Sequence, residues 1–144
     1  MTINSRVARS VRDIRSKLRD LAAAEHGEAT ARTHAAAAHV TNEERMLEDT
    51  LDEAEDTLSG ITNVYALDNV AGLVACQREA ILDAAKAHTA ATEVANLAEA
   101  RLKARIRQLK TAERVVEMVV EDRANREAKA EQHAHDDLVN ARRK

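Results

Sequence analysis

The sequence predicts an all-α fold, a long antiparallel two-helix coiled-coil hairpin with both termini at one end. The chain has no proline and only three glycines. From residue 67 a seven-residue repeat runs to residue 119, and only Gln77, His88 and Arg105 interrupt its apolar character. Its spacing of three and four residues averages 3.5, which keeps one stripe of a helix against a partner helix. The repeat positions are Leu67, Val70, Val74, Gln77, Ile81, Ala84, His88, Ala91, Ala95, Ala98, Leu102, Arg105, Leu109, Ala112, Val116 and Val119.

A first helix is expected over about residues 5–58 of a single hairpin domain that covers residues 1–144. Two apolar repeats in this segment are out of phase when residues are counted by sevens. We therefore expect the register to break within the alanine-rich stretch 22–39, where small side chains bury little area. The opening repeat is Val7, Val11, Ile14, Leu18 and Leu21, and the later repeat is Ala37, Val40, Glu44, Leu47, Leu51, Ala54 and Leu58.

The turn is expected at about residues 59–63, because Ser59-Gly60 is the one helix-stop signal and Thr62 or Asn63 can cap a new helix. The second helix should then cover about residues 64–140. A short connection makes the two helices antiparallel. Folding the chain back near residue 63 places Leu51 close to Val74 or Gln77, and leaves about the last 20 residues without a partner helix.

Composition and motifs exclude most catalytic classes. There is no Trp or Phe, the net charge is −3, and Cys76 is the single cysteine, so no internal disulfide forms and a reducing, cytoplasmic location is expected. The N-terminus lacks an apolar run of signal-peptide length, and no stretch approaches the length of a membrane span. The chain has no HExxH motif and no glycine-rich phosphate loop. We expect no enzyme activity, no catalytic residue, no cofactor and no metal.

Charge is distributed unevenly along the chain. Residues 1–20 and 101–114 are strongly basic, whereas residues 43–57 hold eight acidic residues against Arg45 alone. In a hairpin the two basic stretches lie together toward the termini and the acidic stretch lies near the turn. Such segregation suits either a solvated surface or docking between partners of different charge.

The segment 115–120 (VVEMVV) is apolar all round its helix. A two-helix seam covers only about half of a helix circumference. Two explanations remain open, namely a socket in a partner protein and a thicker junction with Val7, Val11 and Ile14.

The C-terminal stretch AERVVEMVVEDRANREAKAEQHAHDDLVNARRK resembles the FliJ/YscO family of flagellar and type III secretion stalk proteins. The similarity lies in an apolar helix, a charged E-x-R-x-x-R-E run and a terminal acidic-Leu cluster. The N-terminal VRDIRSKLRDLAAAE is also similar to the basic–Leu opening of that family. The matching C-terminal residues are Glu121, Arg123, Arg126, Glu127, Glu131, Asp136, Asp137 and Leu138.

The resemblance implies a non-enzymatic central stalk and chaperone-escort protein. Its partners would be a hexameric export ATPase, the export gate and export chaperones, with membrane contact only through these partners, no nucleic acid, and a monomeric hairpin. The export-gate contact candidates are Glu48, Asp52 and Glu55. The ATPase-contact candidates are Arg6, Arg9, Arg12, Val116, Val119, Val120, Arg123 and Arg126.

Two other classes of function remain as alternatives. A generic structural scaffold or spacer would use the same seam to self-associate. A nucleic-acid-binding protein would use the basic segment 6–19, but a basic-zipper protein needs that segment to run directly into a Leu-repeat dimer seam. The expected break at Ala22 counts against the second alternative.

Overall fold

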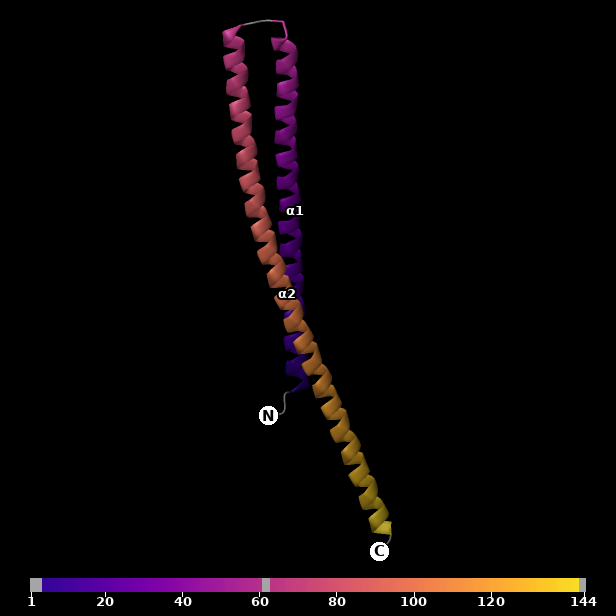
Figure 1. The fold of residues 1–144 in the computed structure, drawn as a ribbon. Coiled ribbons are helices and arrows are strands. Elements are labelled where there is room, and N and C mark those ends of the chain that lie inside the picture. Colours follow the sequence, from indigo (N-terminus) through magenta and orange to yellow (C-terminus); the bar gives the residue numbers. More distant parts are fainter. Residues whose placement is uncertain (1–3, 61–62, 143–144) are drawn as a thin grey trace. The chain divides into compact units, whose positions relative to one another are not determined.

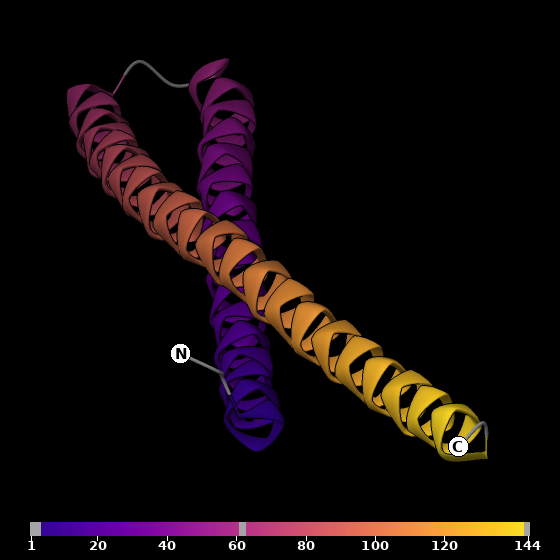
Figure 2. The same cartoon turned by 90° about the horizontal axis from the view of Figure 1, so that it is seen from below.

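The computed structural model confirms the all-α helical hairpin. It describes residues 4–60 and 63–142, except for the side chains of residues 140 and 142. Two long helices pack against each other, and no strand occurs in the described ranges. Helix α1 spans Ser5–Leu58 and helix α2 spans Val64–Arg142 (Figure 1). Each is one unbroken helix, as a second view also shows for α2 (Figure 2).

The packing divides the chain into two compact units. The terminal unit consists of Met1–Ala23 and Arg101–Lys144, and the turn unit consists of Ala24–Ala100. Each unit therefore contains one segment of α1 and one segment of α2. The N-terminal and C-terminal segments of the chain belong to the same unit, as a hairpin requires.

The seven-residue repeat predicted for α2 is confirmed. From Val70 to Val119, every predicted seam position is buried or half-buried. Leu67 is the exception and remains about half exposed, because it lies in the first turn of α2, beside the end of the seam. After Val119, every residue of α2 whose side chain is described is exposed.

The predicted seam of α1 is wrong in phase over its opening segment. In the terminal unit, Leu21 is 59% exposed whereas Ala22 is 6% exposed. In this segment each residue that faces α2 comes one position after the residue predicted to do so. The same seven-residue repeat of inward positions continues through the turn unit. The expected register break in 22–39 is therefore also wrong. The inward positions are Ser5, Ala8, Arg12, Arg15, Arg19, Ala22, His26, Ala29, Thr33, Ala36, Val40, Glu43, Leu47, Thr50 and Ala54.

The unbroken repeat of α2 explains why α1 keeps a single phase along its length. The stripe on α2 is unbroken, so a helix that follows it must present an unbroken stripe with the same 3.5-residue period. A change of phase in α1 would rotate the later or the earlier stripe away from α2. The observed phase keeps Val40, Leu47 and Ala54 of the later predicted repeat. It replaces Ala37, Glu44 and Leu51 by their preceding residues.

Two polar side chains, Thr33 and Gln77, form hydrogen bonds between the two helices within the turn unit. The Thr33 hydroxyl donates to the carbonyl oxygen of Ala91 at 3.1 Å. The Gln77 amide donates to the Thr50 hydroxyl at 2.7 Å and to the Met46 carbonyl at 3.3 Å. Thr33 of α1 contacts Ala91 of α2, and the later residue Thr50 contacts the earlier residue Gln77, so the two helices are antiparallel. Gln77 contacts Thr50, the residue before its predicted neighbour Leu51, so the predicted pairing is met to within one residue.

The helix ends are capped by side chains. Asn4 accepts a hydrogen bond from the Arg6 backbone N–H at 2.9 Å, and Asn63 accepts one from Tyr65 at 3.0 Å. These bonds satisfy N–H groups that lack partners in the first helical turn. Asn63 is thus confirmed as a cap, whereas Thr62 lies outside the described residues. At the end of α1, the Ser59 N–H reaches the Glu55 carbonyl at 3.0 Å.

Alanine dominates the buried positions. Apart from Leu109, the buried side chains of the described residues are all alanines, and all polar or charged side chains in those ranges keep some exposure. Small side chains let helix backbones approach closely, but each contributes little apolar area. Stability should consequently depend strongly on the few large seam residues. The buried alanines are Ala8, Ala22, Ala29, Ala54, Ala84, Ala98 and Ala112.

Leu109→Ala and Leu51→Ala form a matched pair that tests this arrangement. Leu109 is 8% exposed and Leu51 is 46% exposed. We expect Leu109→Ala to lower the free energy of unfolding by about 2–4 kcal/mol, since it leaves a cavity in the seam. Leu51→Ala should cost less than about 1 kcal/mol. Urea denaturation followed by circular dichroism measures both, and equal losses would contradict the observed seam.

Candidate partner-binding site

All eight ATPase-contact candidates lie in the terminal unit. Three come from the first turns of α1 and five from α2, at or after the last seam positions. Within this unit, Ala8 and Val11 border the same groove as Ala112 and Val115. This register places the beginning of α1 beside the segment of α2 that ends at Val119. The unit therefore brings the basic and apolar candidates together.

The five arginines differ in their surroundings. Arg6 and Arg9 are exposed. Arg12 occupies an inward position, is half-buried, and donates two hydrogen bonds to Asp13 at 2.9 and 2.6 Å. Its long aliphatic stem can cover the seam while the guanidinium reaches water. Arg12 is thus a structural residue as well as a candidate contact.

Arg123 and Arg126 are exposed, and each forms an ion pair with a carboxylate of its own helix. Arg123 donates to Glu127 at 2.8 Å, and Arg126 donates to Asp122 at 2.7 Å. The hydrogen bond to Glu127 raises the pKa of Arg123, and the negative charge of Glu127 raises it further. Exposed pairs of this spacing stabilise a helix only slightly. A partner with its own carboxylates can therefore compete for both arginines at small cost.

The apolar candidates are only partly covered by α1. Val116 and Val119 are half-buried at the seam, whereas Val120 is exposed and Met118 is 61% exposed. The thicker junction considered above does not form, because Val7, Val11 and Ile14 are themselves exposed. The VVEMVV segment consequently keeps apolar surface in solvent.

The three export-gate candidates lie in the turn unit. Glu48, Asp52 and Glu55 are exposed, and their spacing of four and three residues puts them on one face of α1. The acidic surface and the basic terminal surface thus belong to different units. A variant of one need not disturb the other.

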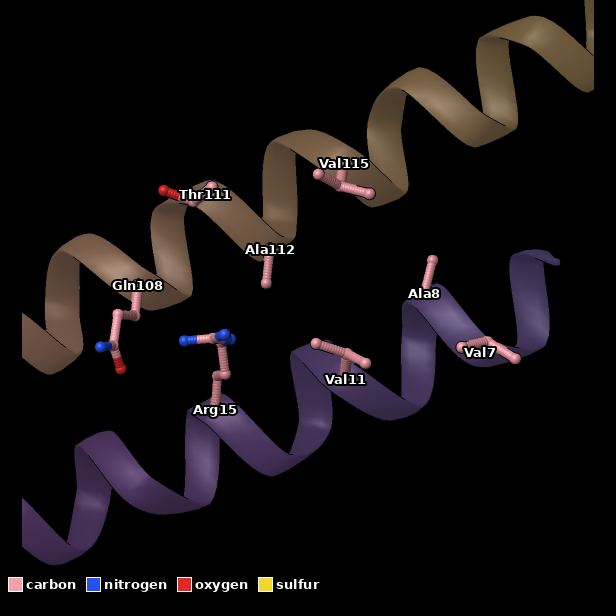
Figure 3. A pocket seen from close by; sticks show the side chains of 8 residues that line it. All are labelled: Val7, Ala8, Val11, Arg15, Gln108, Thr111, Ala112 and Val115. Carbon is pink, nitrogen blue, oxygen red and sulfur yellow. The ribbon is translucent and has the colours of Figure 1, made fainter. Parts of the chain in front are cut away.

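A groove in the terminal unit has a volume of about 570 Å³. It lies between α1 and α2, with Val7 and Val11 on one side, Val115 on the other, and the buried Ala8 and Ala112 at its floor (Figure 3). The remaining lining residues are Arg15, Gln108 and Thr111. Sequence reasoning missed this groove, because it assigned Val7 and Val11 to the seam. The available signal was that an alanine or an arginine follows directly after each of the five large apolar residues from Val7 to Leu21.

No metal site or membrane-spanning helix is visible in the described ranges. No group of three or more His, Cys, Asp or Glu residues there is arranged to hold a metal ion. No helix, as far as the chain is described, is long and apolar enough to cross a membrane. No family model, curated protein or solved structure matches the chain. The chemistry of the site must be judged from its own residues.

The part of α2 after Val120 should be the least protected helix in the isolated chain. Its described side chains are all exposed, and an isolated helix of about 20 residues is only marginally stable in water. We expect its amide protons to show protection factors on the order of 10 or less, whereas those around Leu109 exchange only through global unfolding. Hydrogen exchange measured by mass spectrometry tests this. Equal protection in both segments would show that the tail has a packing partner.

Proposed function

We propose that the protein is a non-enzymatic central-stalk and chaperone-escort protein of a flagellar or type III export ATPase complex, of the FliJ/YscO type, acting in the cytoplasm. The observation that carries this proposal is the terminal unit. There the basic start of α1 packs on the segment of α2 that ends at Val119, and α2 continues beyond Val119 as an exposed helix. An exposed helix with basic and apolar side chains is suited to enter a ring of subunits.

Two kinds of contact would hold such a helix in a ring. Met118 and Val120 offer apolar surface that a socket can cover, and each fully buried aliphatic side chain contributes about 1.5–3 kcal/mol. Arg6, Arg9, Arg123 and Arg126 offer exposed charges that guide docking to an acidic lining. Such contacts weaken as salt screens them.

The turn unit would serve the second contact of the proposed stalk. Glu48, Asp52 and Glu55 form an exposed acidic face there, which suits a basic surface on the export gate. Export chaperones would be carried by the exposed surface that remains.

Reversing Arg9 and Arg123 to Glu tests the terminal contact. Both side chains are exposed, so the double variant should keep the helix content of the wild type by circular dichroism. It should bind the cognate hexameric ATPase at least about tenfold more weakly and lose stimulation of ATP hydrolysis. Arg12 is left unchanged because it lies at the seam. A matched control reverses Arg78 and Lys86, exposed cations of the turn unit, and should stimulate normally.

The acidic surface gives the complementary result. Changing Glu48, Asp52 and Glu55 to Lys should spare ATPase stimulation and weaken binding to the export gate. The proposal fails if the terminal variant stimulates the ATPase normally, or if both variants lose the same partner.

A structural scaffold is the second candidate. The exposed Leu73, Val94 and Leu97 of the turn unit favour it, because exposed apolar side chains at helical spacing can mediate self-association. Sedimentation equilibrium separates the two, since the stalk should be monomeric and the scaffold oligomeric at micromolar concentration.

A further inference from the structure

One face of the terminal unit carries an apolar stripe that the hairpin itself leaves uncovered. On α1 it consists of Val7, Val11, Ile14, Leu18 and Leu21, of which Leu18 is half-buried and the others are exposed. The spacing is four and three residues, the repeat of a coiled-coil seam. Large aliphatic residues at this spacing match a further helix that packs alongside and follows the same repeat.

A groove of about 570 Å³ lies beside this stripe. Val7 and Val11 form one side and Val115 the other, with two alanines at the floor (Figure 3). Small floor residues allow a third helix to approach both α1 and α2. Val7 and Val11 belong both to the stripe and to the groove lining, so the two surfaces adjoin, and we call them together the groove face.

Cations border the groove face. Counting by sevens places Arg15 and Lys17 of α1 along it, and likewise three cations of α2. Asp20 and Glu113 fall on other faces of their helices, whereas Asp13 lies beside Ile14 and Lys17, and Glu121 follows Arg114 one heptad later. Arg12, Arg19, Arg123 and Arg126 form ion pairs within the terminal unit, and these pairs do not include the bordering cations. The cations of α2 are Arg101, Arg107 and Arg114.

We propose that the groove face binds an acidic amphipathic α-helix of a partner protein and forms a three-helix bundle with it. The apolar side of that helix covers Val7, Val11, Ile14 and Val115. Its carboxylates lie along the two flanks, opposite the bordering cations, which sets orientation and speeds association. The proposal does not rest on the stalk function, because it uses a different face from the ATPase-contact candidates.

The chain itself does not provide this helix. In its acidic segment 43–57, the positions that continue the seven-residue spacing of the Val7–Leu21 stripe include Met46. The other such positions include Asp49, Glu53 and Asp56, so no apolar stripe forms there. Two copies joined through their groove faces would bring the bordering cations together, and such like-charge contacts are unfavourable. Charge complementarity therefore favours a different, acidic partner over a second copy.

A pair of synthetic peptides tests the proposal on the full chain. Each peptide has three heptads with Leu at a and d, one with Glu at e and g and the other with Lys there. We expect the Glu peptide to bind, as measured by fluorescence anisotropy, and the Lys peptide to bind at least about tenfold more weakly. Arg107→Gln with Arg114→Gln should weaken binding of the Glu peptide and reduce its dependence on salt.

A triple variant separates the groove face from apolar binding in general. Val7→Gln, Val11→Gln and Ile14→Gln change exposed positions only and use a good helix former, so the hairpin should keep its helix content. Binding of the Glu peptide should fall at least about tenfold. The matched control changes Leu73, Val94 and Leu97 of the turn unit to Gln and should bind as the wild type does.

Four results would overturn the proposal. These are binding of neither peptide, equal binding of both, equal losses in the two triple variants, and a wild-type dimer that the Val7, Val11 and Ile14 variant converts to a monomer. The last result would identify a second copy as the occupant. Because Arg9 and Arg123 are intact in every groove-face variant, ATPase stimulation reports independently on the stalk function.

Discussion

The unbroken apolar stripe of α2 is the constraint on which the rest of the structure depends. It extends from Val70 to Val119 with one phase, and a partner helix must follow that phase or lose contact. Helix α1 follows it from Ser5 to Ala54 at the cost of turning its largest opening side chains outward. Ile14 is 57% exposed, while arginines occupy neighbouring inward positions. The apolar surface outside the seam and the thin alanine core are two consequences of one register.

This arrangement stores little stability per residue. Buried alanines contribute small apolar areas, and the seam also contains polar groups such as Gln77, whose Oε1 atom is buried without a hydrogen-bond partner. A buried polar atom of this kind costs about 1–3 kcal/mol. The Gln77 amide nevertheless contacts two groups of α1 and so favours one register over others. Partner binding along exposed apolar surface can add substantially to a hairpin with so small a core.

The sequence was sufficient for the fold class, the helix ends and the seam of α2, because each depends on local signals. Asn63 and the Ser59-Gly60 stop act within a few residues, and the α2 repeat is long enough to define its own phase. The seam of α1 could not be derived in the same way. Ranking positions by side-chain size selects Val7 to Leu21, but the phase is decided by residues far away in the sequence on α2. The candidate surfaces inherited this error, since Arg12 moved inward and Val7 and Val11 moved out to the groove.

The phase of α1 can be measured directly at two adjacent residues. In a Cys76→Ala background, Leu21→Cys and Ala22→Cys each provide a single thiol, one on the outward stripe and one at the seam. Reaction with a maleimide under native conditions should be at least about tenfold slower for Ala22→Cys than for Leu21→Cys, because only the seam thiol requires local opening. Equal rates, or slower labelling of Leu21→Cys, would contradict the register on which this account depends.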